Sequence, residues 1–234
     1  MTKGESRRLL IAIPPRHGQS ILASVALPAC ILGRDPTCKI IYASYGEQLS
    51  KDFSNRFRDL LWSQNYQAVF PATWIDAGGA SLAEVRTSAK GYRLATTVQG
   101  PATGKGAHLA IVDDPFKAAE AGSESMRNAV HDWFKGSLMT RFDKRAEGGM
   151  IVIQQRLHQD DLIGRLRDEG GWEYLEMPAE CIERRVFDLG DGESWIFEPG
   201  DLLFEERFDQ TALERLALDL GEGQYNSFDN VTTP

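Results

Sequence analysis

The sequence predicts an α/β fold in which a parallel sheet is covered by helices on both faces. Short apolar runs of strand length alternate along the chain with longer segments whose apolar residues recur at helical spacing, and this alternation is typical of parallel α/β sheets. The run at residues 8–13 is continuously apolar after Arg8, as expected for a central strand covered on both faces, and residues 150–153 form a further apolar run. With 234 residues and 42% hydrophobic residues, the chain can bury one full-sized core.

Composition and charge argue against several classes of protein. Charged residues make up 26% of the chain, and the net charge of −8 argues against a surface covered with cations, although a local basic groove is compatible with it. The three cysteines, Cys30, Cys38 and Cys181, form no CxxC pair, so we expect neither a zinc site nor a disulfide framework. No apolar run reaches the length of a membrane span, and the first residues lack the pattern of a signal peptide. We therefore expect a soluble intracellular protein.

Local patterns predict the individual elements. Apolar residues on most faces indicate a buried helix over residues 20–32, which Gly33 is expected to end. Residues 46–64 carry apolar side chains at helical spacing and predict an amphipathic helix. Two alternating segments predict a β-hairpin over residues 83–100. The remaining expected elements are strands at 8–13, 38–44, 107–115, 150–153 and 172–180, and helices at 123–142, with Ser123 as its cap, 160–170 and 209–221.

The stretch PPRHGQS, residues 14–20, joins the first strand to the first helix and has the layout of a phosphate-binding loop. Gly18 lets the backbone approach a ligand, the helix N-terminus favours an anion, and Ser20 places a hydroxyl where Mg²⁺ would bind. The full pattern, G-x-x-x-x-G-K-[ST], has a glycine at the position of Ile13 and a lysine at that of Gln19. A strand-to-helix turn without a ligand is therefore the alternative interpretation.

A second candidate element is the apolar strand that ends in Asp113 and Asp114. Adjacent carboxylates at the carboxyl end of a buried strand lie where open α/β sheets bind ligands. In P-loop ATPases such a strand lies beside the first one, its leading acid helps to hold Mg²⁺, and the next acid polarises the attacking water. A solvated Asp-Asp-Pro turn that ends a strand is the alternative.

A third strand ends in Gln154, Gln155 and Arg156. It is expected to reach the same edge of the sheet, where its side chains would sense a γ-phosphate. A structural ion pair between Arg156 and Asp161 is the alternative interpretation of the arginine.

Together these pieces resemble the large terminase subunit of tailed bacteriophages, the motor that packages DNA into capsids. The resemblance covers residues 9–208 and is carried, in order, by IPPRHGQS, YASYGEQLSKDFSNRFRDLL, GPATGKGAHLAIVDDPFK and IVIQQRLHQDDLIGRL. It implies a three-layer P-loop NTPase with a RecA-like parallel sheet of the additional-strand class and flanking helices. Residues 1–208 would form this ATPase domain, and residues 209–234 a short helix and linker toward a nuclease domain that is absent here.

The resemblance also implies a role for each candidate residue. The nucleotide-binding loop would comprise Pro15, Arg16, His17, Gly18, Gln19 and Ser20. Ser20 and Asp113 map to the Mg²⁺ ligands, and Asp114 maps to the catalytic acid. The coupling motif that transmits hydrolysis to DNA movement would comprise Gln154, Gln155 and Arg156, the last also acting in catalysis. Lys105 lies where relatives often carry an arginine that reaches a neighbouring subunit's nucleotide, although lysine lacks the guanidinium fork.

The implied function is an ATPase motor that uses Mg²⁺ and ATP to move double-stranded DNA. Its subunits would form a homo-oligomeric ring on a portal protein, together with a small terminase subunit, at the procapsid portal in the host cytoplasm and without a membrane partner. Relatives read PPRHGKS, so Gln19 replaces a lysine whose positive charge offsets the phosphates, and Arg16 is the candidate to compensate. The alternative is a catalytically impaired prophage remnant that folds and binds nucleotide or partners without turnover. The QQRLHQDDL block argues against a helicase or recombinase.

Overall fold

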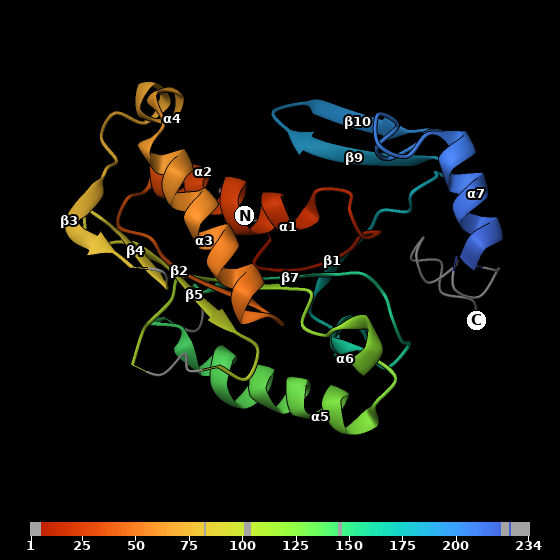
Figure 1. Ribbon diagram of the computed structural model, residues 1–234, viewed down its shortest axis with the longest axis horizontal. Coiled ribbons are helices and arrows are strands. Elements are labelled where there is room, and N and C mark those ends of the chain that lie inside the picture. The colour runs from red at the N-terminus through yellow and green to blue at the C-terminus, as the bar shows by residue number, and fades with distance from the viewer. Residues whose placement is uncertain (1–5, 82, 101–103, 145–146, 221–224, 226–234) are drawn as a thin grey trace.

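The computed structural model describes residues 6–81, 83–100, 104–144, 147–220 and 225 (Figure 1). Within these residues an eight-stranded sheet has the order β3-β4-β5-β2-β6-β7-β1-β8. Its strands are, in chain order, β1 (Arg8–Ala12), β2 (Lys39–Ser44), β3 (Ile75–Ala80), β4 (Glu84–Thr87), β5 (Tyr92–Thr97), β6 (Leu109–Asp113), β7 (Gly149–Gln154) and β8 (Glu173–Glu176). The six strands β5, β2, β6, β7, β1 and β8 pair in parallel with their neighbours. At the other edge, β3 pairs antiparallel with β4, and β4 pairs antiparallel with β5.

Helices cover both faces of the sheet, which gives three layers (Figure 1). One face carries α1 (Gln19–Ile21), the π-helical segment η1 (Leu22–Ala26), α2 (Leu27–Arg34), α3 (Glu47–Trp62) and α4 (Gln64–Val69). The other carries α5 (Glu124–Trp133), the π-helical segment η3 (Phe134–Leu138), the 3-10 turn η4 (Met139–Arg141) and α6 (Leu162–Glu169). Alternate residues of β2 point into the two resulting cores, Ile40 and Tyr42 into one and Ile41 into the other. The predicted α/β architecture is confirmed.

The strand β7 lies between β1 and β6. We expected the strand of Asp113 to lie beside the first strand, and this was wrong, because β7 pairs with both neighbours, Ile153 opposite Ile11 and opposite Asp113. The inserted β7 has the place of the additional strand that the resemblance implies. Because the three strands are parallel, their carboxyl ends meet at one edge of the sheet.

The helix after β1 contains a π-helical segment with an identifiable cause. Pro28 has no N–H, so the carbonyl of Ser24, four residues earlier, loses its α-helical donor. That carbonyl accepts instead from Arg93 Nε of β5, at 2.9 Å. The irregular helix is therefore tied to the sheet by a buried arginine.

Two predicted helix boundaries differ from the structure. Gly33 was expected to end the first helix, but it lies inside α2, where an added Cβ would approach the Phe70 ring to 2.5 Å, so its position reflects close packing. Ser123 is at the N-cap of α5 as expected, but its hydroxyl lies 3.0 Å from that of Ser125 and makes no capping hydrogen bond.

The segment after β8 contains a hairpin that we did not predict. Strands β9 (Arg185–Gly190) and β10 (Glu193–Phe197) pair antiparallel, and three rings, Phe187, Trp195 and Phe197, stack along one face. The Asp191–Gly192 turn was the missed signal, since Asp-Gly between apolar runs is typical of hairpins. The predicted last helix is confirmed as α7 (Gln210–Leu220), whereas residues 221–224 and 226–234 of the predicted linker lie outside the described residues.

Candidate functional site

The loop between β1 and α1 lies at the sheet edge where β6 and β7 also end. It is anchored by the backbone N–H of Ile13, which donates to the Gln154 carbonyl at 3.3 Å. Arg16 (φ 65°) and Gly18 (φ 83°) adopt left-handed backbone conformations, and Gly18 is the N-cap residue of α1. Such a turn before a helix leaves backbone N–H groups and the positive end of the helix dipole directed toward the loop.

The side chains of this loop divide into buried and exposed groups. Gln19, in the position of the usual lysine, is 6% exposed, and His17 is 7% exposed. Arg16 is exposed and provides the loop's cation. Positive charge in this loop therefore comes from Arg16, three residues from the usual position.

Asp113 is the last residue of β6, next to the loop, and Asp114 follows it. Ser20 Oγ donates to Asp113 Oδ1 at 3.3 Å, which joins the loop directly to the acid. Asp114 has a left-handed backbone (φ 43°), and its Oδ1 accepts from the backbone N–H of Gln155 at 3.2 Å. The structure thus brings together three of the strand ends that the sequence predicted to converge.

Burial perturbs both carboxyl groups. It raises the pKa of Asp113 and of Asp114, and the neighbouring Asp114 charge raises that of Asp113 further. Adjacent carboxyls with raised pKa values at a sheet edge are typical of functional sites, and a bound cation would favour their ionised forms.

The arrangement fits a magnesium site that is completed by a nucleotide. Mg²⁺ usually keeps several waters and takes one or two protein oxygens together with phosphate oxygens. Ser20 Oγ and Asp113 Oδ1 are adjacent oxygens of this kind. The described residues contain no cluster of three or more His, Cys, Asp or Glu side chains arranged to hold a metal without a ligand.

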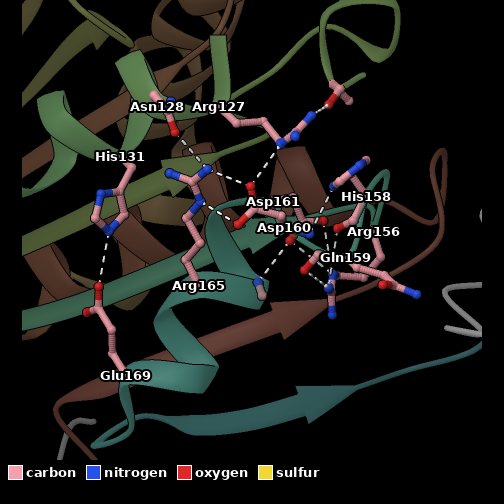
Figure 2. Close-up of polar contacts among 12 residues, drawn as sticks. Arg127, Asn128, His131, Arg156, His158, Gln159, Asp160, Asp161, Arg165 and Glu169 are labelled. Atoms are coloured by element: carbon pink, nitrogen blue, oxygen red, sulfur yellow. Dashed lines mark hydrogen bonds and ion pairs between the residues drawn. The ribbon is translucent and has the colours of Figure 1, made fainter. Parts of the chain in front are cut away.

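Arg156, just after β7, forms a buried ion pair with Asp161 (Figure 2). Its Nε lies 2.9 Å from Asp161 Oδ2, and the two side chains are 3% and 0% exposed. Asp161 Oδ1 also accepts from the backbone N–H of Gly164 at 2.9 Å, which caps α6. The structural ion pair is thus present, and a role for Arg156 at a γ-phosphate stays a prediction.

Gln154 ends β7 with a buried amide that is 2% exposed. Neither its Oε1 nor its Nε2 has a hydrogen-bond partner within the described part of the chain. An unsatisfied buried amide costs about 1–3 kcal/mol, and such a group calls for a functional explanation.

Lys105, the predicted trans-acting residue, is engaged within its own chain. Its Nζ lies 2.8 Å from Glu84 Oε2 and 5.1 Å from the centroid of the Tyr92 ring. The preceding residues 101–103 lie outside the described residues. Its action on a neighbouring subunit stays a prediction.

Sequence reasoning missed a polar network between α5, α6 and the turn after β7 (Figure 2). Asp160 accepts from Arg127 Nε at 3.2 Å and from Arg165 Nε at 2.7 Å. Arg127 also donates to the carbonyl of Ala121, in the segment that follows Asp114. The turn after β7 is thereby connected to the segment after β6. No local spacing signals this pair, because Asp160 lies before α6 and Arg165 is five residues further along the chain.

Comparisons with known proteins give fold-level matches. No family model and no curated protein matches the sequence. Among solved structures, the large terminase of bacteriophage HK97 matches with a TM-score of 0.61 and 13% identity, over 97% of this chain and 47% of that chain. The large terminase of a thermophilic bacteriophage, in complex with ADP, matches with a TM-score of 0.55 and 10% identity, over 97% of this chain and 48% of that chain. The chain therefore has the three-layer, RecA-like P-loop fold of these proteins and spans about half of their length.

Proposed function

We propose that this chain is the ATPase motor domain of a phage DNA-packaging terminase, which couples Mg²⁺-dependent ATP hydrolysis to translocation of double-stranded DNA into a capsid. The observation that carries the proposal is the contact of Ser20 with Asp113, 3.3 Å between their oxygens, where the loop before α1 meets the end of β6. A phosphate loop and an acidic strand end meet in this way in enzymes that transfer phosphoryl groups. The fold shared with two phage large terminases supports the same assignment.

The loop residues would bind and orient the phosphates. Backbone N–H groups around Gly18 and Gln19 would hold the β-phosphate at the N-terminus of α1. Ser20 and Asp113 would hold Mg²⁺, which when bound offsets phosphate charge and polarises the γ-phosphate. Pro15 and His17 would fix the loop from within, since His17 Nδ1 lies 3.0 Å from the Pro15 carbonyl oxygen.

Asp114 would orient the attacking water and accept its proton. One of its carboxylate oxygens accepts from the Gln155 N–H, which leaves the other for the water. Burial raises its pKa toward neutrality, which makes its carboxylate a stronger base than an exposed aspartate. The free carboxylate oxygen and the raised pKa support the proposal that Asp114 would act as the general base.

The contact of Asp114 with Gln155 would also start the coupling to DNA movement. A shift of Asp114 on hydrolysis would pull on Gln155 and on Arg156 beside it, and Arg156 is fixed by Asp161 at the N-terminus of α6. The unsatisfied amide of Gln154 would gain a hydrogen bond in the second state. Hydrolysis would thus change the position of α6.

The partners follow from the same proposal. Several copies of the chain would form a ring on a portal protein in the host cytoplasm, with a small terminase subunit bringing DNA and with Lys105 reaching the next subunit's nucleotide. Contacts with DNA would involve backbone phosphates and be independent of sequence. Among the described residues, no helix is both long and apolar enough to cross a bilayer.

A second candidate function is a catalytically impaired prophage remnant. Gln19 favours it, because a neutral, almost buried side chain replaces the phosphate-gripping lysine. Such a chain would bind ADP or ATP without turnover. Nucleotide binding without hydrolysis by the purified chain is the result that would select this candidate.

The test is Mg²⁺-dependent ATP hydrolysis by the purified chain and by Asp114→Asn. The matched control is Asp59→Asn, which neutralises an exposed carboxylate on α3. We expect Asp114→Asn to lower kcat by about 10²–10⁴-fold, the usual contribution of a general base, and Asp59→Asn to keep the parent rate. Stimulation by double-stranded DNA would support the motor assignment. If Asp114→Asn hydrolysed ATP as fast as the parent chain, Asp114 would not be the general base.

A further inference from the structure

Tyr42 of β2 contacts Asp113 from the side opposite Ser20. The Tyr42 side chain is fully buried, and its hydroxyl donates to Asp113 Oδ2 at 2.9 Å. Ser20 Oγ donates to the other oxygen, Oδ1, at 3.3 Å. The two hydroxyls therefore occupy one carboxylate oxygen each and fix the plane of the carboxylate.

The ring of Tyr42 is held in turn by Arg93 of β5. The Arg93 guanidinium carbon lies 4.7 Å from the Tyr42 ring centroid and 5.1 Å from that of Phe57, so the cation lies against two rings. Arg93 is fully buried, and in the described part of the chain its hydrogen bonds go to a carbonyl and a hydroxyl, with no ion pair to a carboxylate. Burial lowers its pKa to about 10, which leaves the guanidinium charged at neutral pH.

Arg93 also joins this arrangement to the helix that follows the phosphate loop. Its Nε donates to the Ser24 carbonyl at 2.9 Å and its Nη1 to Ser54 Oγ of α3 at 3.0 Å. The Ser24 carbonyl is available because Pro28 has no N–H. The helix after the loop, the Tyr42 ring and Asp113 are thereby fixed relative to one another.

Packing alone does not require the hydroxyl of Tyr42. A phenylalanine would fill the same space and keep the contact with Arg93, because a cation also interacts with a phenyl ring. A buried hydroxyl must be desolvated, and here it donates its hydrogen bond to the carboxylate proposed to hold Mg²⁺. The hydrogen bond to Asp113 therefore accounts for a tyrosine, and not a phenylalanine, at this position.

We propose that Tyr42 is a positioning residue of the ATP site, whose hydroxyl orients the carboxylate of Asp113 so that Oδ1, beside Ser20, faces the metal, with Arg93 fixing the Tyr42 ring from behind. This inference rests on the proposed function, because it assigns Tyr42 to the same site. Tyr42 acts through Asp113 and touches neither nucleotide nor metal.

The test compares Tyr42→Phe with Tyr66→Phe. Tyr66 is the matched control, because it is also buried in the same core and its hydroxyl donates to the Ala29 carbonyl at 2.9 Å, within the helical layer. Binding of ADP is measured by calorimetry with and without Mg²⁺, after circular dichroism has confirmed folding. We expect Tyr42→Phe to weaken binding about tenfold with Mg²⁺ and to leave binding without Mg²⁺ unchanged, since one hydrogen bond to a charged group is lost. Tyr66→Phe should bind as the parent does.

A double-mutant cycle with Asp113→Asn separates positioning from a structural role. If Tyr42 acts through Asp113, Tyr42→Phe should have no further effect on Mg²⁺-dependent binding in the Asp113→Asn background. Equal binding by Tyr42→Phe and Tyr66→Phe, or full additivity in the cycle, would overturn the inference and leave the proposed function standing. Failure of the parent to bind ADP, with or without Mg²⁺, would instead overturn the proposed function, and this inference with it.

Discussion

The imidazole of His17 stacks on the ring of Phe208, with centroids 4.9 Å apart and an interplanar angle of 16°. His17 lies in the loop between β1 and α1, and Phe208 lies two residues before α7. This aromatic contact therefore connects the candidate phosphate loop to the segment just before the last helix.

This contact predicts a loss of stability in mild acid. Burial, aided slightly by the charge of Arg207, lowers the pKa of His17 below its ordinary value. The unfolded chain therefore binds a proton more readily, so the contribution of His17 is complete above about pH 6.5 and is lost as the pH falls. Urea unfolding across this range should show a steeper loss for the parent than for His17→Phe, which keeps a ring but cannot titrate. If the free energy of unfolding fell equally with pH for the parent and for His17→Phe, His17 would not be the cause of the loss in acid.

Replacing Gln154 by methionine should stabilise the protein. The substitution removes a buried amide without a partner in the described residues and keeps the length of the side chain. We expect the free energy of unfolding to rise by about 1–3 kcal/mol. The matched control is Gln67→Met, because the Gln67 amide donates to the carbonyls of Leu61 and Thr73 and its loss should destabilise. Equal destabilisation by both changes would mean that the Gln154 amide is satisfied.

Changing Asp160 or Asp161 to asparagine should lower the free energy of unfolding by very different amounts, although the two acids are adjacent (Figure 2). Asp161→Asn leaves the buried Arg156 charge uncompensated and should lower the free energy of unfolding by about 3–5 kcal/mol. The Asp160 side chain is 45% exposed, so solvent screens its ion pairs with Arg127 and Arg165. Asp160→Asn should therefore lower the free energy of unfolding by about 1 kcal/mol or less. Denaturant unfolding of both variants measures the difference. A similar cost for both would contradict the assignment of Arg156 and Asp161 as the buried pair.

Gly164 and Gly136 provide a test of the turn that holds Arg156. A Cβ at Gly164 would lie 1.9 Å from the Gln159 carbonyl oxygen, so Gly164→Ala must displace the turn and should destabilise by roughly 1–3 kcal/mol. Gly136 is helical and a Cβ there would have no neighbour within 4 Å, so Gly136→Ala should stabilise by about 0.5–1 kcal/mol. Thermal unfolding distinguishes the two directions. A neutral Gly164→Ala would mean that the turn relaxes freely.

Local patterns in the sequence predict seven of the eight strands of the main sheet and most helices, and they point to the candidate residues of the site, but they miss β3, β9 and β10. The loop around Gly18 and the acids after β6 were identified because glycine, hydroxyl and carboxylate residues occur where elements end. The position of β7 between β1 and β6 could not be derived from local pattern, because strand order is set by how helices pack across the sheet. The resemblance to terminases did imply an additional strand.

The residues that support the site were harder to predict. Tyr42 and Arg93 lie in strands that read as ordinary buried segments, and their contacts with Asp113 and Ser24 join positions far apart in the sequence. The same holds for Phe208, whose contact with His17 spans nearly the whole chain. A burial pattern shows that a side chain is inside, but not which polar atom it meets there.

The most direct test of the account is the rate of Mg²⁺-dependent ATP hydrolysis by Gln19→Lys, measured beside the parent chain. If residues 13–20 form a phosphate loop, restoring the cation should stabilise the transition state and raise kcat by roughly 10²–10⁴-fold. Asp114→Asn in the Gln19→Lys background should then abolish the gain. A measurable turnover rate that is the same for Gln19→Lys and for the parent would contradict the claim that residue 19 is where this loop lacks its phosphate-binding cation.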